Sequence, residues 1–516
     1  MSDRTKWRRW TLLSVALFAL LAIWAVANPM FASPDETVHM VRAQGFANLD
    51  FSNPYRTDGI PIGEVDCFRF EPDTTAECMV LTWPTAPVEI DARSTDGYPP
   101  LLHVVAAVPA VAVDGLGGAY AMRVWMAAVV AALLGWAAML LSRPGMGPWP
   151  LVALVASLTP QVVFISSSVN PSGLTAASAA VLAAALVSFV TPYRHAPEVR
   201  AAVIVGVLGL VLTRRDGVLM LAALVAAMAP LVWFGSAATV RDAVRKGLGR
   251  SAALLVGLVV GVIAVAAVVL RSWGGYAIDY LRNPGRRYRS ADIAEAVGSV
   301  PGYLYELVGV FGWRDTPIGP LFVAIGVIIV VVLLVLVVTV APRRLAVATL
   351  WAFMVMTAVI VVSGMIEFTY LQARYLFPVW IAAMVTAGVA IDAGRPARSI
   401  SAMLTPVVLG LWAVLQFGAF FVNQRRYSVG LNQVWSPSAA TRWDPPLLSN
   451  SVAMVAMIAA VVLAVWVITT VANQGRHRSE GDDRSTMSAG RRSSVQRDGV
   501  DPDRAQPKRS VFGALR

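Results

Sequence analysis

The sequence predicts an all-α, polytopic membrane protein with about 12–13 transmembrane helices. Of its 516 residues, 57% are hydrophobic and only 14% are charged, whereas soluble domains average about 25% charged residues. The mean hydropathy is +0.65. Long apolar runs recur along the chain, each close to the ~20 residues that a helix needs to cross a bilayer. The composition therefore excludes a soluble globular protein.

Twelve apolar runs have the length of a membrane span, namely residues 10–28, 119–141, 150–169, 173–191, 199–213, 217–234, 251–271, 318–341, 345–364, 375–391, 402–422 and 451–472. The first run lacks a small-x-small cleavage site and many spans follow it, so we interpret it as a retained anchor and not as a signal peptide. A further stretch, 98–113, opens with two prolines and is short. We expect it to form a re-entrant or shallow helix, although a thirteenth crossing remains an alternative.

Basic residues set the expected orientation. Much of the net charge of +11 lies in residues 1–9 and 473–516, which the positive-inside rule places in the cytoplasm. We therefore expect a cytoplasmic N-terminus, a membrane domain over 10–472 and a disordered basic tail, and we expect no nucleic-acid partner. The long polar loops 29–118 and 272–317 then lie on the extracytoplasmic side.

The only two cysteines, Cys67 and Cys78, both fall in the first long loop. In an extracytoplasmic loop we expect them to form a disulfide, and two free thiols are the alternative. The pair has no histidine nearby in the sequence, and the four histidines of the chain are scattered. We therefore predict no metal site and no cofactor.

A helix start follows the first span directly. Ser33 is a suitable N-cap, Pro34 suits the first helical position, and Glu36 completes a capping box with Ser33. Ionisable side chains so close to a span are costly and need a reason. The alternative is a capped juxtamembrane helix with no further role.

The same helix predicts a polar face, because residues three and four apart lie side by side. That face carries Asp35, His39 and Arg42. Asp35 and Glu36 are the catalytic candidates. Glu36 is the more structural of the two, and Asp35 is left free for chemistry.

Further polar segments fall on the same predicted face of the membrane. Their candidate substrate-binding residues, with His39 and Arg42, are His103, Arg123, Asn170, Arg214, Arg215, Trp313, Arg314, Asp315, Arg374 and Tyr375. Each has an ordinary explanation, such as a helix-ending proline, an interfacial aromatic residue or a snorkelling arginine. Their convergence favours an anionic, lipid-linked substrate, since arginines pair with phosphate oxygens and a carboxylate can act as a general base. The reaction that these groups suggest is glycosyl transfer from a polyprenyl-phosphate sugar.

An ordered series of short motifs resembles a known bacterial membrane family, the domain of unknown function 2142. The motifs are Asn28-Pro29, Ser33-Pro34-Asp35-Glu36-x-x-His39, Tyr98-Pro99-Pro100, Ser168-Val169-Asn170-Pro171, Gly312-Trp313-x-Asp315-Thr316 and Arg374-Tyr375-x-x-Pro378. The resemblance runs from about residue 10 to about residue 470. It implies a fold of the C-type glycosyltransferase (GT-C) superfamily, a polyprenyl-phosphate sugar donor, and catalysis by an acidic residue at the position of Asp35. The chain departs from the family pattern at Ser172, where aspartate is common, and at Arg214, which replaces a lysine.

These observations together predict a metal-independent glycosyltransferase of the bacterial plasma (inner) membrane. The expected partners are a polyprenyl-phosphate-linked sugar donor, a cell-envelope glycan or glycolipid acceptor, and membrane lipid, with the active site on the extracytoplasmic side. A transporter or flippase of lipid-linked saccharides is the main alternative, and a non-catalytic scaffold is another. The collection of charge at one face, not at the bilayer midplane, favours the enzyme.

Overall fold

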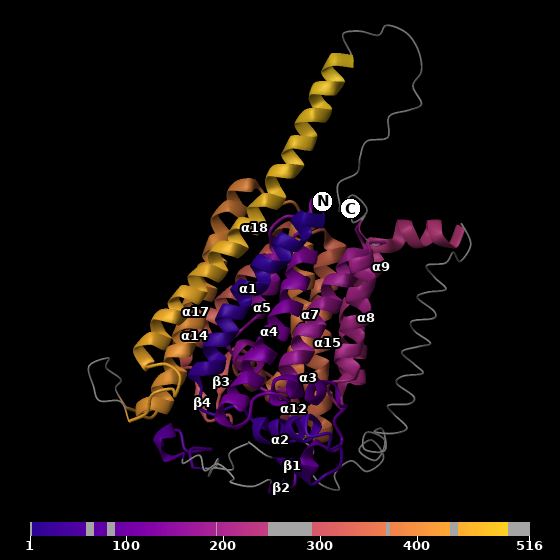
Figure 1. Cartoon of the computed structure of the whole chain (residues 1–516). Coiled ribbons are helices and arrows are strands. Elements are labelled where there is room, and N and C mark those ends of the chain that lie inside the picture. Colours follow the sequence, from indigo (N-terminus) through magenta and orange to yellow (C-terminus); the bar gives the residue numbers. More distant parts are fainter. Residues whose placement is uncertain are drawn as a thin grey trace.

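The computed structural model describes residues 3–493, except for 58–66, 80–87, 192, 194, 246–291, 368–371 and 434–441. Long helices run side by side between two ends of the molecule (Figure 1). The chain begins at one end, where α18 also leaves the bundle. The opposite end carries the short helices and the strands, and we call it the α2 end.

The α-helices are α1 Asp3–Ala27, α2 Glu36–Ala47, α3 Leu101–Ala110, α4 Gly115–Leu141, α5 Trp149–Ser157, α6 Pro160–Ser166, α7 Pro171–Phe189, α8 Pro197–Val211, α9 Gly217–Arg245, α12 Ile293–Gly298, α13 Val300–Gly309, α14 Pro320–Val340, α15 Arg343–Glu367, α16 Phe377–Ala393, α17 Arg398–Val429 and α18 Asn450–Ser493. Short 3-10 helices are η1 Ala76–Cys78, η2 Arg93–Thr95 and η3 Ala373–Leu376. Two antiparallel strand pairs complete the fold, β1 Tyr55–Thr57 with β2 Val88–Ile90, and β3 Val310–Phe311 with β4 Thr316–Pro317.

Nine helices in the described part of the chain are long and apolar enough to cross a membrane, and the bent pair α5–α6 makes a tenth candidate. The polytopic all-α prediction is therefore confirmed. The predicted run 251–271 lies outside the described residues. Helix α3 has 10 residues and rises only ~15 Å, half the hydrocarbon thickness of a bilayer, so residues 98–113 do not form a crossing helix.

The predicted span 150–169 is broken. Its two halves, α5 and α6, meet at 68°. Pro160 starts the second half, and the Thr159 side chain caps it by accepting from the Val162 N–H. The Leu158 carbonyl at the break accepts hydrogen bonds from Trp412 Nε1 at 2.9 Å and Gln416 Nε2 at 2.7 Å. Neighbouring side chains thus satisfy the backbone group that the break frees inside the membrane domain.

Helix α16 forms the centre of the bundle and packs against α5, α7, α9 and α15. Its apolar segment is 100% buried, whereas that of α14 is only 28% buried. Helix α14 exposes valines and leucines on its outer side, which suits contact with lipid. The difference separates a protein-enclosed centre from a lipid-facing periphery.

Helix α1 is fixed at the α2 end by an aromatic cluster. The Trp24 ring lies 5.9, 5.2 and 5.1 Å from the rings of Phe164, Phe311 and Phe420, in edge-on geometry. Further along, α1 packs closely on α4, where a Cβ on Gly135 would lie 2.1 Å from Ser14 Oγ. This packing fixes the point at which residues 28–36 leave the bundle.

Helix α18 continues past residue 473, where the sequence predicts the start of a disordered tail, and ends at Ser493. The disorder of the tail stays a prediction. No proline interrupts the chain between 473 and 493, and the first one beyond is Pro502. Without a proline, nothing in this segment blocks the helical hydrogen bonds that continue from the span.

Candidate functional site

The predicted cap of α2 is wrong. The helix begins at Glu36, and Asp35 holds the N-cap position with φ +62° and makes no capping hydrogen bond through its side chain. Ser33 instead accepts a hydrogen bond from Ser168 Oγ at 2.9 Å, because the chain here is packed against the start of α7. A left-handed aspartate is tolerated better than most residues but still costs ~1 kcal/mol, so this turn is held by its contacts.

Glu36 and Arg123 form a buried ion pair. Arg123 donates from Nε to Glu36 Oε1 at 2.8 Å and from Nη2 to Oε2 at 2.5 Å, and the Val169 N–H also donates to Oε1 at 3.1 Å. The two side chains are 0% and 1% exposed. Arg123 also donates to the carbonyls of Ala25, Asn28 and Pro29. The sequence predicts Glu36 as catalytic and Arg123 as substrate-binding, but both are enclosed by protein and instead hold the start of α2 against α1, α4 and α7.

Asp35 pairs with Arg374, which lies in η3. Arg374 donates from Nη2 to Asp35 Oδ2 and from Nη1 to the Pro34 carbonyl at 3.0 Å. Asn170 Nδ2 donates to the same carbonyl at 2.9 Å. The Asp35 side chain remains 41% exposed, whereas Arg374 is 4% exposed. The structure thus brings together three predicted site residues and leaves the carboxylate accessible.

The environment keeps the Asp35 carboxylate charged. Burial raises its pKa, but the nearby Arg374 guanidinium, His39 and, to a smaller extent, the Arg214 guanidinium together lower it by more, and the net pKa lies below the ordinary value of 3.8. Asp35 is therefore ionised at neutral pH and can accept a proton.

Arg214 and Tyr375 extend this group. The Arg214 guanidinium lies 4.2 Å from the centre of the Tyr375 ring, and that of Arg374 lies 5.4 Å from it. Arg214 also donates to Asp216 at 2.7 and 3.0 Å and to Ser172 Oγ at 2.8 Å. The two positions that depart from the family pattern, Ser172 and Arg214, thus contact each other. Sequence reasoning missed Asp216, although it directly follows the two arginines in the turn before α9.

His39 and Arg215 contact the Tyr98 ring, and His103 lies against His39. His39 Nδ1 lies 3.2 Å from His103 Nε2, and the His39 and Tyr98 ring centres are 5.1 Å apart. The Arg215 guanidinium lies 5.1 Å from the Tyr98 ring centre, and Arg42 donates to the Tyr98 carbonyl at 3.0 Å. Tyr98 therefore contacts three predicted site residues, and His103 joins them through His39.

Both histidines are neutral at physiological pH. Burial lowers the pKa of His39 to about 3, more than the nearby Asp35 carboxylate raises it. Burial also lowers the pKa of His103 well below its usual range. We therefore assign them positioning roles, without a charge change in the working range of pH.

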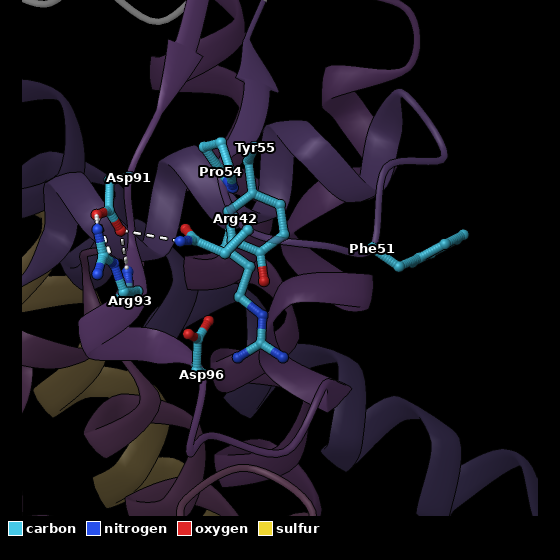
Figure 2. Close-up of a pocket in the computed structure, with 8 residues that line it drawn as sticks. Arg42, Phe51, Pro54, Tyr55, Asp91, Arg93 and Asp96 are labelled. Carbon is cyan, nitrogen blue, oxygen red and sulfur yellow. Dashed lines mark hydrogen bonds and ion pairs between the residues drawn. The ribbon is translucent and has the colours of Figure 1, made fainter.

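Arg42 leads from this group to a cavity of about 790 Å³ beside β1 and β2 (Figure 2). Arg42 also donates to the Thr95 carbonyl. The Tyr55 hydroxyl and the Asp96 carboxylate lie close to its guanidinium. Burial lowers the pKa of Arg42, and the interactions with Tyr55 and Asp96 only partly offset that effect.

Trp313, Arg314 and Asp315 lie in the turn between β3 and β4 and, among the described residues, form no hydrogen bond or ion pair with Asp35 itself. Trp313 Nε1 donates to the Phe31 carbonyl at 3.3 Å. Arg314 pairs with Glu306 at 3.1 Å. Arg314 and Gly312 have φ +68° and +60°, as such a tight turn requires.

Asp315 belongs to an anchoring group that sequence reasoning did not find. It pairs with the buried Arg426 at 3.4 Å and accepts from the Phe70 N–H at 3.0 Å. Arg426 also donates to the carbonyls of Phe68, Glu71 and Thr74. The predicted disulfide between Cys67 and Cys78 is present. The three carbonyls belong to the loop that it closes, so Arg426 docks this loop on α17. The signal for this role was the Arg425-Arg426-Tyr427 patch near the end of α17.

Across the residues that the structure describes, no group of three or more His, Cys, Asp or Glu side chains is placed to hold a metal ion. Around Asp35, the α2 end offers a ligand arginine donors, the accessible Asp35 carboxylate and aromatic rings. Such a set suits an anionic organic ligand.

Membrane-length helices and a polar α2 end define the chain as a polytopic helical membrane protein. A family model described as a predicted membrane protein (DUF2142) matches residues 18–385, and the chain belongs to that family. The matched range includes every candidate site residue from Asp35 to Tyr375. No curated protein and no solved structure matches the chain.

Proposed function

We propose that this protein is a glycosyltransferase of the bacterial inner membrane, related in fold to the GT-C enzymes. It transfers a sugar from a polyprenyl phosphate to a hydroxyl of a cell-envelope glycan or glycolipid on the extracytoplasmic side. The observation that carries the proposal is the pair of an ionised, accessible Asp35 and a buried Arg374 at one end of the membrane bundle.

In the proposed reaction, an acceptor hydroxyl oxygen attacks the anomeric carbon of the donor sugar. A new carbon–oxygen bond forms while the bond from that carbon to the phosphate oxygen breaks. The electron pair of the broken bond leaves with the polyprenyl phosphate. The hydroxyl proton moves to the Asp35 carboxylate, which becomes a carboxylic acid and later returns the proton to water.

Arg374 and Arg214 are the groups that we assign to the leaving phosphate. They lie near the same Tyr375 ring, at 5.4 and 4.2 Å from its centre. Fixed guanidinium groups stabilise charge as it develops on phosphate oxygens, and they do so more strongly where protein excludes water. Arg123 and Arg426 are excluded from this role because they are buried and paired with buried carboxylates, whereas Arg314 pairs with Glu306 and stays partly exposed.

A strain that lacks the gene, complemented with variants, tests the proposal. Mass spectrometry of its envelope glycans should show a missing sugar that the unchanged protein restores and Asp35→Asn does not. Asp114→Asn is the matched control, because Asp114 is an exposed aspartate at the same end, just before α4. Restoration of the sugar by Asp35→Asn at normal protein levels would overturn the role of Asp35.

A vesicle assay distinguishes the enzyme from a transporter or flippase. Membrane vesicles that contain the protein and a lipid-linked sugar should form glycosylated acceptor only if the protein is a transferase. Movement of the lipid-linked sugar across the vesicle membrane, without transfer, would identify a transporter instead. The gathering of charged groups at the α2 end supports the transferase, because transporter sites lie near the bilayer midplane.

A further inference from the structure

The polar cavity beside β1 and β2 is distinct from the Asp35–Arg374 pair. Its lining includes Arg42, Asn53, Tyr55, Asp91, Arg93 and Asp96. Its volume of about 790 Å³ falls within the range of small-molecule sites, ~300–1,000 Å³. Most such sites are lined mainly by apolar side chains, so the density of hydrogen-bonding groups here is unusual.

The cavity is linked to the proposed catalytic group through α2. Asp35 and Arg42 lie seven positions apart on the chain, and a helical rise of 1.5 Å per residue separates them by ~10 Å. Between them, Arg42 donates to the Tyr98 carbonyl, and the Tyr98 ring contacts His39. A ligand that occupies the cavity therefore lies within a short molecular length of the accessible carboxylate.

One donor beside the cavity is buried without a partner. Arg42 is 7% exposed, and its Nε has no hydrogen-bond partner among the residues that the structure describes. A buried donor without a partner costs ~1–3 kcal/mol. The Arg42 side chain lines the cavity, but its Nε is enclosed by protein (Figure 2), so the polar groups that a ligand meets there include those of Asn53, Tyr55 and Asp96.

The charged side chains of the lining already lie beside side chains of opposite charge. Arg93 pairs with Asp91 at 2.6 Å, and the Arg42 guanidinium faces the Asp96 carboxylate. What remains is a mixture of donors and acceptors on arginine, aspartate, asparagine and tyrosine side chains. Such a mixture complements neutral hydroxyl groups, each of which donates one hydrogen bond and accepts others.

We propose that this cavity is the acceptor subsite and binds a neutral, hydroxyl-rich saccharide whose far end reaches Asp35. That the bound saccharide is the acceptor of the transfer rests on the proposed function. The binding of a neutral saccharide at Arg42, Tyr55 and Asp96 stands on the cavity itself.

Saturation-transfer NMR on the full chain in lipid nanodiscs, without sugar-based detergent, tests the proposal. The probes are neutral trisaccharides of glucose, mannose, galactose and arabinose, and trigalacturonate represents an acidic saccharide. We expect at least one neutral trisaccharide to bind in preference to trigalacturonate. Tyr55→Phe and Asp96→Asn should each weaken that binding about 2- to 10-fold, the effect of losing one hydrogen bond.

Matched variants control for nonspecific effects. Tyr120→Phe removes a hydroxyl from the same end of the molecule, and Asp114→Asn neutralises an aspartate there, both outside the cavity. Neither should change binding. Absence of binding by every neutral probe, preference for trigalacturonate, or binding that Tyr55→Phe and Asp96→Asn leave unchanged would overturn the proposal.

The outcomes also separate this proposal from the proposed function. Asp35→Asn should bind the neutral trisaccharide as the unchanged protein does, because Asp35 does not line the cavity. Binding at the cavity together with normal envelope glycans in the Asp35→Asn strain would remove the enzyme and keep the saccharide site. Loss of the envelope sugar in that strain, without saccharide binding at the cavity, would keep the enzyme and remove the saccharide site.

Discussion

Asp35 and Glu36 are neighbours in the chain, and each pairs with a buried arginine, yet the two carboxylates differ in exposure and in the number of their hydrogen-bond donors. The Glu36–Arg123 pair is 0% and 1% exposed, and three donors bind the carboxylate. The Asp35 carboxylate is 41% exposed, and the hydrogen bond from Arg374 leaves it open on one side. The first pair is enclosed by helices, whereas the second lies where a ligand can reach it.

The difference shows how one short turn can serve both stability and chemistry. The left-handed conformation of Asp35 reverses the chain, so that consecutive side chains point to different surroundings. Glu36 enters the contact of α2 with α4 and α7, and this contact fixes the turn. Removal of one partner of a buried pair costs ~3–5 kcal/mol, whereas exposed pairs contribute ~0–1 kcal/mol. Stability should thus depend on Glu36 and activity on Asp35.

The largest expected effect is on the rate of transfer. Asp35→Asn removes the proton acceptor, and general base catalysis contributes ~10²–10⁴-fold. We expect transfer in isolated membranes to fall by about that factor, with the thermal unfolding midpoint nearly unchanged. A fall in both the rate and the midpoint would make Asp35 a structural residue like its neighbour.

The second effect reverses that pattern. Glu36→Gln leaves the Arg123 charge buried without its partner and should lower the free energy of unfolding by ~3–5 kcal/mol. We expect poor accumulation in the membrane and a lower unfolding midpoint, measured by heating the purified protein. Asp35→Asn is the matched control, one residue away. Equal midpoints for the two variants would contradict the comparison.

The sequence predicted the membrane bundle well, because hydrophobic length alone identifies spans. The polar segments that it assigned to one side do gather at the α2 end, whereas the side of the membrane that this end faces stays a prediction from the basic residues. The sequence could not predict which charged side chains form ion pairs. Spacing cannot show that Arg123 turns inward to Glu36 while Arg374, from far along the chain, reaches Asp35. The predicted N-cap of α2 was wrong for the same reason, because Ser33 accepts a hydrogen bond from Ser168, which lies in a distant segment of the chain.

A third, smaller effect concerns the disulfide loop, which the Arg426 group also holds. Cys67 and Cys78 are 11 positions apart, and closing a loop of this length stabilises a fold by about 3 kcal/mol in the chain-entropy model. The Cys67→Ser, Cys78→Ser double variant should lose about that much. Because Arg426 still binds the loop carbonyls, we expect Asp35-dependent transfer to persist once the protein is folded. Loss of transfer in a folded double variant would show that the loop supports the site directly.

The smallest effect is a pH dependence of stability, in which His39 and Asp35 lose their contributions in different pH ranges. His39 has a pKa of about 3 in the fold and about 6.5 when unfolded, so the unfolded chain binds its proton first as pH falls. Its contribution to stability is complete above about pH 6.5 and should decline by about 2 kcal/mol by pH 5. The pKa of Asp35 lies below that of an ordinary carboxyl group, so its contribution is lost only at lower pH, as pH falls through its folded pKa.

The unfolding midpoint measured between about pH 5 and pH 8 checks this sign, and His39→Gln should reduce the decline, leaving the part that His103 contributes through its own lowered pKa. The transfer rate of the folded enzyme should stay level over the same range, because Asp35 remains charged and His39 remains neutral. An acid limb in the rate near pH 6.5 that disappears in His39→Gln would show that His39 exchanges protons during turnover. In that case, the proton from the acceptor would have to travel past Asp35 to the buried histidine pair, and the open carboxylate would no longer be the final acceptor.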